Sequence, residues 1–269
     1  MTQPQNLSRA LERIRADVRA MHAYVVQPAT GMLKMDAMEN PFGLPSALQA
    51  ALGARLGALP LNRYPGERLE DLKTALMDYA GAPAGSAILL GNGSDEIISL
   101  LALACSQAGE RAKLLAPMPG FVMYPMSAQL QGLDFVNVSL DADFELDEAA
   151  MVAAIAEHRP AITYLAYPNN PTATLWDEAV VQRVIDAAGA QGGLVVMDEA
   201  YQPFASRSWL ARMHAEPERN AHVLLMRTLS KFGLAGVRLG YLIGPAALVG
   251  EIDKVRPPYN VSVLNAEAA

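Results

Sequence analysis

The sequence predicts an α/β fold with a mostly parallel sheet and helices on both of its faces. From about residue 67, short apolar runs alternate with segments of helical length. Strands that are apolar throughout are typical of a parallel sheet, because the connecting helices bury both of its faces. The runs are AILLG (87–91), KLLAP (113–117), FVNVSL (135–140), AITYLAY (161–167), GLVVMDE (193–199) and HVLLMRT (222–228).

Residues 1–44 are predicted to form a helix and an arm. Five apolar residues near the N-terminus follow one another at steps of four and three, which predicts one face of a helix that should pack against another part of the structure. They are Leu7, Leu11, Ile14, Val18 and Met21. The next segment is rich in Gly and Pro and is predicted to be extended. It leads to a helix near residues 45–57, and we expect one large domain over residues 45–269.

The composition favours small molecules as partners. The 269 residues carry a formal net charge of −7, which gives no reason to expect nucleic acid or an anionic membrane surface. No apolar run approaches the ~18 residues of a membrane span, and the N-terminus lacks the apolar core of a signal peptide. The single cysteine, Cys105, cannot form an intrachain disulfide, and its surroundings predict a buried helix position. We therefore expect a cytoplasmic protein.

Two patterns that resemble metal sites do not have the required spacing. Acidic residues alternate over 141–147, but Leu146 stands where a calcium loop needs glycine and Val152 where it needs glutamate. The histidines are scattered without the spacing of metal ligands. They are His22, His158, His214 and His222. We predict no metal.

Polar residues follow four of the predicted strands. GNGSDE (91–96) follows the first strand, YPNNPT (167–172) the fourth, Asp198 and Tyr201 the fifth, and residues 228–231 the sixth. Ligands of open α/β sheets bind at the carboxyl ends of the strands. One site is therefore predicted to gather these residues.

The glycine turn and a downstream arginine suit an anion. Gly91, Gly93 and Ser94 lie between a strand and a predicted helix, where free backbone N–H groups and the helix dipole favour a phosphate. Such a turn is also common as simple geometry. Arg238 could clamp a phosphate, or it could form a surface ion pair.

Lys231 is the leading catalytic candidate. A lysine near cations and an apolar wall has a lowered pKa, as an imine-forming amine requires; the alternative is an ordinary solvated lysine. Asp198 ends an apolar strand, and its buried charge needs a cation such as a pyridinium nitrogen; the alternative is a capping or salt-bridged aspartate. Tyr201 could donate to a ring oxygen, or belong to the core.

Seven motifs in the same order resemble the fold-type I pyridoxal-phosphate aminotransferases, and more closely their histidinol-phosphate aminotransferase branch. The resemblance spans nearly the whole chain. The motifs are MENPFGLP (38–45), NRYPG (62–66), GNGSDEII (91–98), PGFVMY (119–124), YPNNPT (167–172), VVMDEAY (195–201) and RTLSKFGLAGVRLGY (227–241).

The resemblance implies a role for each matching residue. Lys231 would hold pyridoxal 5'-phosphate covalently and move a proton to and from the substrate, and Asp198 would keep the pyridine nitrogen protonated. Tyr201 and Asn170 would bind the phenolic oxygen, while Phe121 would stack on the ring. Tyr124 would be a packing residue. The phosphate cup would comprise Gly93, Ser94, Asp95, Thr228, Ser230 and Arg238.

The resemblance also implies a homodimer, in which Tyr64 reaches the phosphate bound by the neighbouring subunit. Tyr24, Asn40 and Asn170 would bind substrate. The chain departs from the wider family in having one residue fewer between Lys231 and Arg238. We also expect it to stop near the end of the large domain, so that the small C-terminal domain, with an arginine for the carboxylate of 2-oxoglutarate, is largely absent.

The activity implied is transamination of L-histidinol phosphate with 2-oxoglutarate, which gives imidazole acetol phosphate and glutamate in histidine biosynthesis. Two alternatives remain open at this point. Another pyridoxal-phosphate enzyme of the same fold, an aromatic aminotransferase or a phosphothreonine decarboxylase relative, would keep the same lysine, aspartate and asparagine. An inactive folded fragment is the other alternative.

Overall fold

The computed structural model describes residues 5–23, 25, 28–107 and 109–269. By contacts within the chain, these residues form two units, 1–38 and 39–269, which are described separately. The predicted boundary between arm and large domain at residue 44 stays a prediction.

The N-terminal unit contains two short helices instead of the single predicted helix. They are α1 (Gln5–Leu11) and α2 (Ala16–Ala20), and the chain turns between them. On the predicted apolar face, Leu7 and Ile14 are exposed, and no residue of α2 is buried. Helices of this length are marginal without packing, which explains why the periodic pattern did not produce one long helix.

The second unit is built on a seven-stranded sheet of order β1-β7-β6-β5-β4-β2-β3. The strands β2 to β6 pair in parallel, and β7 runs antiparallel to both of its neighbours. The strands are β1 (Ser86–Gly91), β2 (Lys113–Met118), β3 (Asp134–Ser139), β4 (Ile162–Ala166), β5 (Leu194–Asp198), β6 (Val223–Thr228) and β7 (Gly240–Pro245). All six predicted strands are confirmed, and β7 was not predicted.

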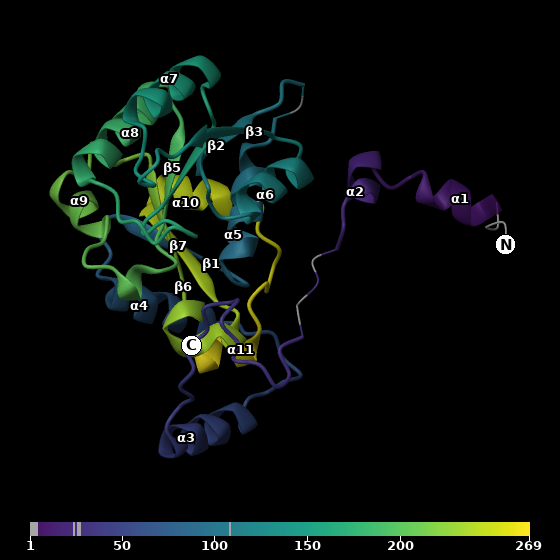
Figure 1. Ribbon diagram of the computed structural model, residues 1–269. Helices are drawn as coiled ribbons and strands as arrows, with labels where there is room; N and C mark the ends of the chain where they lie inside the picture. Colours follow the sequence, from purple (N-terminus) through teal and green to yellow (C-terminus); the bar gives the residue numbers. More distant parts are fainter. Residues whose placement is uncertain (1–4, 24, 26–27, 108) are drawn as a thin grey trace. The chain divides into compact units, whose positions relative to one another are not determined.

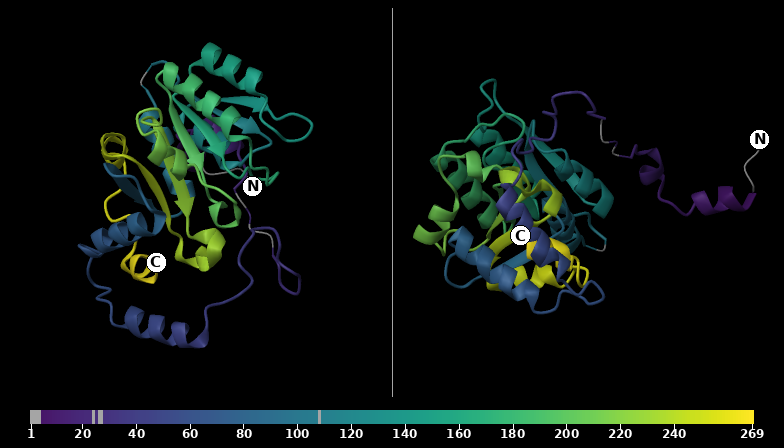
Figure 2. Two further views of the ribbon diagram at one scale, coloured as in Figure 1. Left: turned by 90° about the vertical axis from the view of Figure 1, so that its left-hand side faces the viewer. Right: turned by 90° about the horizontal axis from the view of Figure 1, so that it is seen from below.

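Helices cover both faces of this sheet, as predicted (Figures 1 and 2). One face packs against α5 (Ser94–Cys105), α6 (Met123–Gln131) and α10 (Ala246–Asp253). The other packs against α4 (Arg68–Ala80), α7 (Glu148–His158), α8 (Glu178–Ala190) and α9 (Leu210–Ala215). Side chains alternate between these two cores: on β5, Val195 and Met197 face the α8 side and Val196 the α5 side.

Two further helices, α3 (Ser46–Gly57) and α11 (Val263–Ala268), complete the second unit. The helix predicted near residues 45–57 is α3, and none of its residues is buried. The last helix, α11, contacts both α3 and α4. Glu267 on α11 pairs with Arg55 and Arg68, which joins the three helices by charge. None of the helices among the described residues combines the length and apolar character that crossing a membrane requires.

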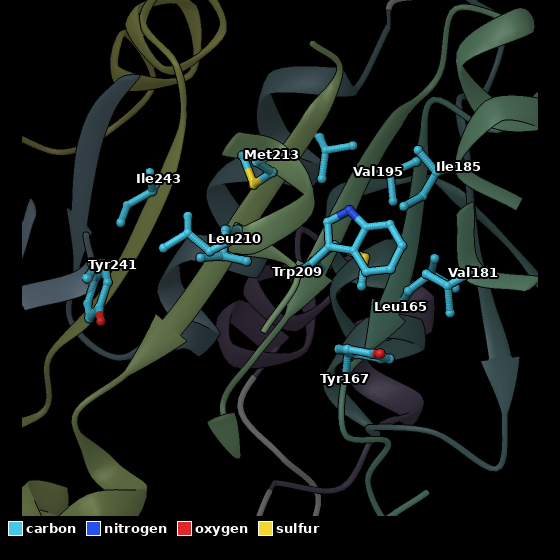
Figure 3. Close-up of a cluster of buried hydrophobic side chains, with 14 of the residues drawn as sticks. Leu165, Tyr167, Val181, Ile185, Val195, Trp209, Leu210, Met213, Tyr241 and Ile243 are labelled. Atoms are coloured by element: carbon cyan, nitrogen blue, oxygen red, sulfur yellow. The ribbon is translucent and has the colours of Figure 1, made fainter. Parts of the chain in front are cut away.

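The core on the α8 side is centred on Trp209 (Figure 3). Its ring meets Tyr167 edge to face, with 5.9 Å between centroids, and its indole nitrogen donates to Asn220 at 3.0 Å. The phenol of Tyr167 in turn accepts a hydrogen bond from Arg207 at 2.7 Å. Both aromatic residues are fully buried, so they hold the ends of β4 and β5 in fixed positions.

The acidic segment over 141–147 forms a turn and a helix cap. Asp141 accepts hydrogen bonds from the amides of Asp143 and Glu145, and Asp147 caps α7 by accepting from the amide of Ala150 at 2.9 Å. Acidic residues at such positions satisfy backbone donors that a turn or a helix start leaves unpaired. Local backbone geometry accounts for this pattern.

Candidate active site

The turn from β1 to α5 is shaped for an anion. Gly93, at φ +84°, is the N-cap of α5, and no side chain caps the first turn of this helix. A Cβ at Gly93 would lie 2.7 Å from Nη2 of Arg238, and one at Gly240 would lie 2.6 Å from the amide nitrogen of Ser94. Glycine is therefore required at both positions. The uncapped amides and the guanidinium provide donors for a phosphate.

The turn is stabilised by hydrogen bonds to Glu96, a residue that the sequence analysis did not single out. Glu96 accepts hydrogen bonds from the amide of Asn92 at 2.7 Å and from the side chain of Asn260 at 2.6 Å. The same Asn260 amide lies 3.0 Å from the carbonyl oxygen of Leu90. Nothing in the sequence connects residues so far apart, so only the fold reveals this contact.

Arg238 reaches the phosphate turn although it is one residue closer to Lys231 than in the wider family. The residue follows the short helix η3 (Ala235–Val237) and adopts a left-handed conformation at φ +51°. Its Nη2 atom lies 3.8 Å from Oδ2 of Asp95. This ion pair is half-exposed, and pairs of that kind contribute at most about 1 kcal/mol, so it leaves the guanidinium able to bind an anion.

Lys231 lies in η2 (Ser230–Leu234), directly after β6. Thr228, the last residue of β6, accepts a hydrogen bond from the Ser230 amide at 3.2 Å, and its hydroxyl lies 2.9 Å from the Ser230 hydroxyl. The Lys231 ammonium lies 5.5 Å from the centroid of the Tyr201 ring. A cation over an aromatic face is attracted by the ring quadrupole, so this contact directs the amine toward Tyr201.

Asn40 contacts the loop that carries the lysine. Its side-chain amide donates to the carbonyl oxygen of Phe232 at 3.2 Å, and its Oδ1 accepts from the amide of Phe42 at 2.9 Å. Gly233 adopts φ +135°, and a Cβ there would lie 3.1 Å from the Asn40 amide nitrogen. The predicted substrate residue Asn40 is thus brought next to Lys231 in the fold.

Asp198 is the buried carboxylate of the site. It is 5% exposed at the end of β5 and accepts hydrogen bonds from the Tyr124 hydroxyl at 2.7 Å and from the Ala200 amide at 3.0 Å. Burial raises its pKa to about 6, while the hydrogen bond from Tyr124 lowers it. Burial and the charge of Asp198 also raise the pKa of the half-buried Tyr201. A cation beside Asp198 would therefore be strongly favoured.

Three aromatic rings line the wall beside Asp198. Phe121 meets Tyr124 edge to face at 5.7 Å between centroids, and Tyr124 stacks on Tyr164 at 4.4 Å. The sequence predicted Tyr124 as a packing residue only, and the structure adds its hydrogen bond to Asp198. Its position three residues after Phe121, at the start of α6, is the signal that could have indicated a shared face.

The loop after β4 is held by Asn169, the neighbour of the predicted Asn170. Asn169 is buried, and its side-chain amide donates to the Pro119 carbonyl at 3.1 Å and to the Thr172 hydroxyl at 2.8 Å. These bonds tie the YPNNPT loop to the segment that precedes Phe121. Asn170 is half-buried at the tip of this loop.

A buried ion pair lies next to the site, on the α8 side of the sheet. Arg227 donates from Nε and Nη2 to one oxygen of Glu199, at 3.0 and 2.9 Å, and both side chains are buried. Glu199 also accepts from Ser208 and from the Trp209 amide. Glu199 follows Asp198 in the sequence, and Arg227 precedes Thr228. The ion pair therefore fixes the backbone next to both site residues.

Tyr64 is not part of this cluster. Tyr64 is 75% exposed and stacks on Tyr259, with 4.2 Å between centroids. Tyr24 lies outside the described residues. Gly240 pairs with both Gly91 and Thr228 and so sets the phosphate turn beside the lysine loop.

The donor set fits pyridoxal phosphate. An uncapped helix start and Arg238 suit its phosphate, the buried Asp198 suits a protonated ring nitrogen, and Lys231 supplies an amine for its carbonyl carbon. The fold and this set of groups together define a pyridoxal-phosphate transferase of the α/β class.

Comparison with known proteins identifies the family within this class. The model of the class I and II aminotransferases matches residues 30–269, and the chain belongs to this family. It is 81% identical to a histidinol-phosphate aminotransferase of Acidovorax sp. (strain JS42), over 100% of this chain and 73% of that protein. It is 69% identical to the protein of the same name from Polaromonas naphthalenivorans (strain CJ2), over 95% of this chain and 68% of that protein.

Solved structures have the same fold. The histidinol-phosphate aminotransferase of Sinorhizobium meliloti, solved in complex with pyridoxal-5'-phosphate, superposes with a TM-score of 0.72 at 28% identity. The match covers 86% of this chain and 61% of that one. A putative histidinol-phosphate aminotransferase from Erwinia carotovora atroseptica gives a TM-score of 0.77 at 25% identity, covering 91% and 70% of the two chains.

Proposed function

We propose that this protein is a pyridoxal-phosphate-dependent transaminase of L-histidinol phosphate, acting in histidine biosynthesis. The proposal is supported by the positions of Lys231 directly after β6, Asp198 at the end of β5 and the uncapped start of α5 after β1, since these strands and β7 are neighbours in the sheet. The substrate is supported by the histidinol-phosphate aminotransferases to which the chain is 81% and 69% identical. The amino acceptor 2-oxoglutarate and a cytoplasmic location are part of the same proposal.

Each group in the site has a task in binding the cofactor. The amides of Gly93, Ser94 and Asp95 bind the phosphate together with Arg238. Thr228 and Ser230 add hydroxyl donors beside this anion. Asn170 and Tyr201 bind the phenolic oxygen, and Phe121 packs on the ring face.

The chemistry depends on where a proton can be held. Bound pyridoxal phosphate supplies an electron sink, which makes the proton on the amine-bearing carbon of the substrate removable. The amine of Lys231 would take this proton from the substrate carbon as general base and then donate it as general acid. Asp198, kept charged, pairs with the protonated ring nitrogen and so stabilises the negative charge that develops. Asn40 positions the loop of Lys231 and borders the space for substrate.

The substrate is tested by single-turnover conversion of the cofactor. We expect L-histidinol phosphate, added without an acceptor, to convert the bound pyridoxal form to pyridoxamine phosphate, which chromatography detects after denaturation. Subsequent addition of 2-oxoglutarate should restore the pyridoxal form and give glutamate. L-Histidinol, which lacks the phosphate, is the matched control. Conversion by an aromatic amino acid but not by L-histidinol phosphate would overturn the assigned substrate.

A homodimer in which Tyr64 reaches the partner's phosphate is also proposed. The exposure of Tyr64 supports a role outside its own subunit, because it leaves the side chain accessible to a partner. When Lys231→Ala and Tyr64→Phe chains are mixed under limiting cofactor, about a quarter of the sites should become intact in a dimer of C2 symmetry. Activity should therefore appear on mixing. No gain over the separate variants, or a monomer by sedimentation, would contradict this arrangement.

A further inference from the structure

A buried hydrogen bond joins Tyr124 to Asp198, and no role has yet been assigned to it. The Tyr124 hydroxyl lies 2.7 Å from Oδ2 of Asp198, and these residues are 1% and 5% exposed. The other carboxylate oxygen accepts from the amide of Ala200 at 3.0 Å. Each oxygen of Asp198 therefore has one donor from the chain, and the carboxylate is fixed in rotation about its side-chain bonds.

We propose that Tyr124 is a positioning residue that keeps Asp198 ionised and aims its carboxylate at the ring nitrogen of the cofactor. The inference rests on the proposed function, since it concerns the same site. A charged carboxylate only accepts hydrogen bonds, so the Tyr124 hydroxyl must donate, and this donation favours the ionised form over the neutral acid.

The ring of Tyr124 has little freedom to turn away. It stacks on Tyr164 at 4.4 Å with 17° between the ring planes, and Phe121 packs against it edge to face at 5.7 Å. Because both neighbours are rings in the same wall, the phenol is held in one rotamer. The hydroxyl is therefore directed at Asp198 before any cofactor binds, which avoids an ordering cost on binding.

Two acidic groups near Asp198 act in the opposite direction. Burial raises the pKa of Asp198, and so do the negative charges of Asp95 on α5 and of Glu199, the residue that follows Asp198. The phenols of Tyr164 and Tyr201 are neutral in the same region, since burial and the charge of Asp198 raise the pKa of each. Tyr124 and the Ala200 amide both favour the ionised carboxylate of Asp198 through their hydrogen bonds, and the Tyr124 bond has the larger effect.

The test compares Tyr124→Phe with Tyr164→Phe. Both variants remove one hydroxyl from a buried tyrosine of the same stack, but within the described residues the Tyr164 hydroxyl has no hydrogen-bond partner. The apoprotein is labelled with ¹³C at the aspartate carboxyl carbons, and Asp198→Asn identifies the resonance. Tyr124→Phe should raise the titration midpoint of Asp198 by about one to two pH units, the value of a hydrogen bond to a charged group. Tyr164→Phe should leave the midpoint where it is.

Affinity for pyridoxal phosphate gives a second measurement. At neutral pH, Tyr124→Phe should bind the cofactor about two- to tenfold more weakly, and the loss should shrink at higher pH, where Asp198 ionises again. An unchanged midpoint in Tyr124→Phe, or an equal shift in both variants, would overturn the proposal. The carboxyl titration needs no substrate and no turnover. Its result therefore tests the role of Tyr124 independently of the proposed transamination.

Discussion

Replacing Lys231 by alanine is expected to lower the rate of transamination by at least about 10³-fold. The variant loses both the amine that holds the cofactor covalently and the general base that moves the substrate proton, and general acid–base catalysis alone contributes about 10²–10⁴-fold. The rate is measured as product formed from L-histidinol phosphate and 2-oxoglutarate. Borohydride treatment followed by peptide mapping should label Lys231 in the unaltered protein and no residue in the variant.

Lys254→Ala is the matched control for this variant. Lys254 is exposed on the surface and pairs only with Glu251 among the contacts of its ammonium in the described part of the chain. This control should keep its rate and its borohydride label. A rate in Lys231→Ala close to that of the control, or a label on another lysine, would remove Lys231 from its catalytic role.

Breaking the buried pair of Arg227 and Glu199 should give the largest loss of stability. Arg227→Met leaves the Glu199 carboxylate buried without its cation, and removing one partner of a buried pair costs about 3–5 kcal/mol of unfolding free energy. The free energy of unfolding is measured on the apoprotein by urea titration. The double variant Arg227→Met, Glu199→Gln, which leaves neither charge behind, should lose clearly less than the two single variants together.

The loss in Arg227→Met should also depend on pH. Burial raises the pKa of Glu199 and the charge of Arg227 lowers it, so removal of Arg227 raises this pKa further. A carboxyl whose pKa is higher in the folded than in the unfolded state stabilises the fold at low pH and loses that contribution as pH rises through the folded value. The variant should therefore be closer to the unaltered protein at about pH 5 than at about pH 8. A pH-independent loss would indicate a packing defect instead.

The parallel part of the sheet could be predicted because its strands are buried on both faces. Runs such as ITYLA and VLLMRT consist mostly of apolar residues, and this pattern does not depend on which strands are neighbours. The strand β7 escaped prediction because GYLIGP contains two glycines and ends in proline, residues that are typical of loops. The N-terminal helix was predicted too long because periodicity alone does not show whether the apolar face has a partner.

Some residues of the site could likewise be predicted from the sequence, and others could not. Lys231, Asp198 and the glycine turn follow strand ends directly, so the order of the elements was enough to bring them together. Glu96 and Asn260 meet across 164 positions of the chain, and Tyr124 meets Asp198 across 74. Contacts of this kind depend on the order of strands in the sheet and on helix orientation, and local patterns in the sequence contain neither.

The position of β7 determines when the site can be completed during synthesis. Among the described strands, β1 pairs only with β7, so the turn that ends at Ser94 gains its place in the sheet only after residues 240–245 have been made. This is about 150 residues later, or on the order of ten seconds at the usual rate of translation. A nascent chain can therefore pair β2, β3, β4 and β5 before it can hold a phosphate. Cofactor capture is then a late event, which follows emergence of β7 from the ribosome.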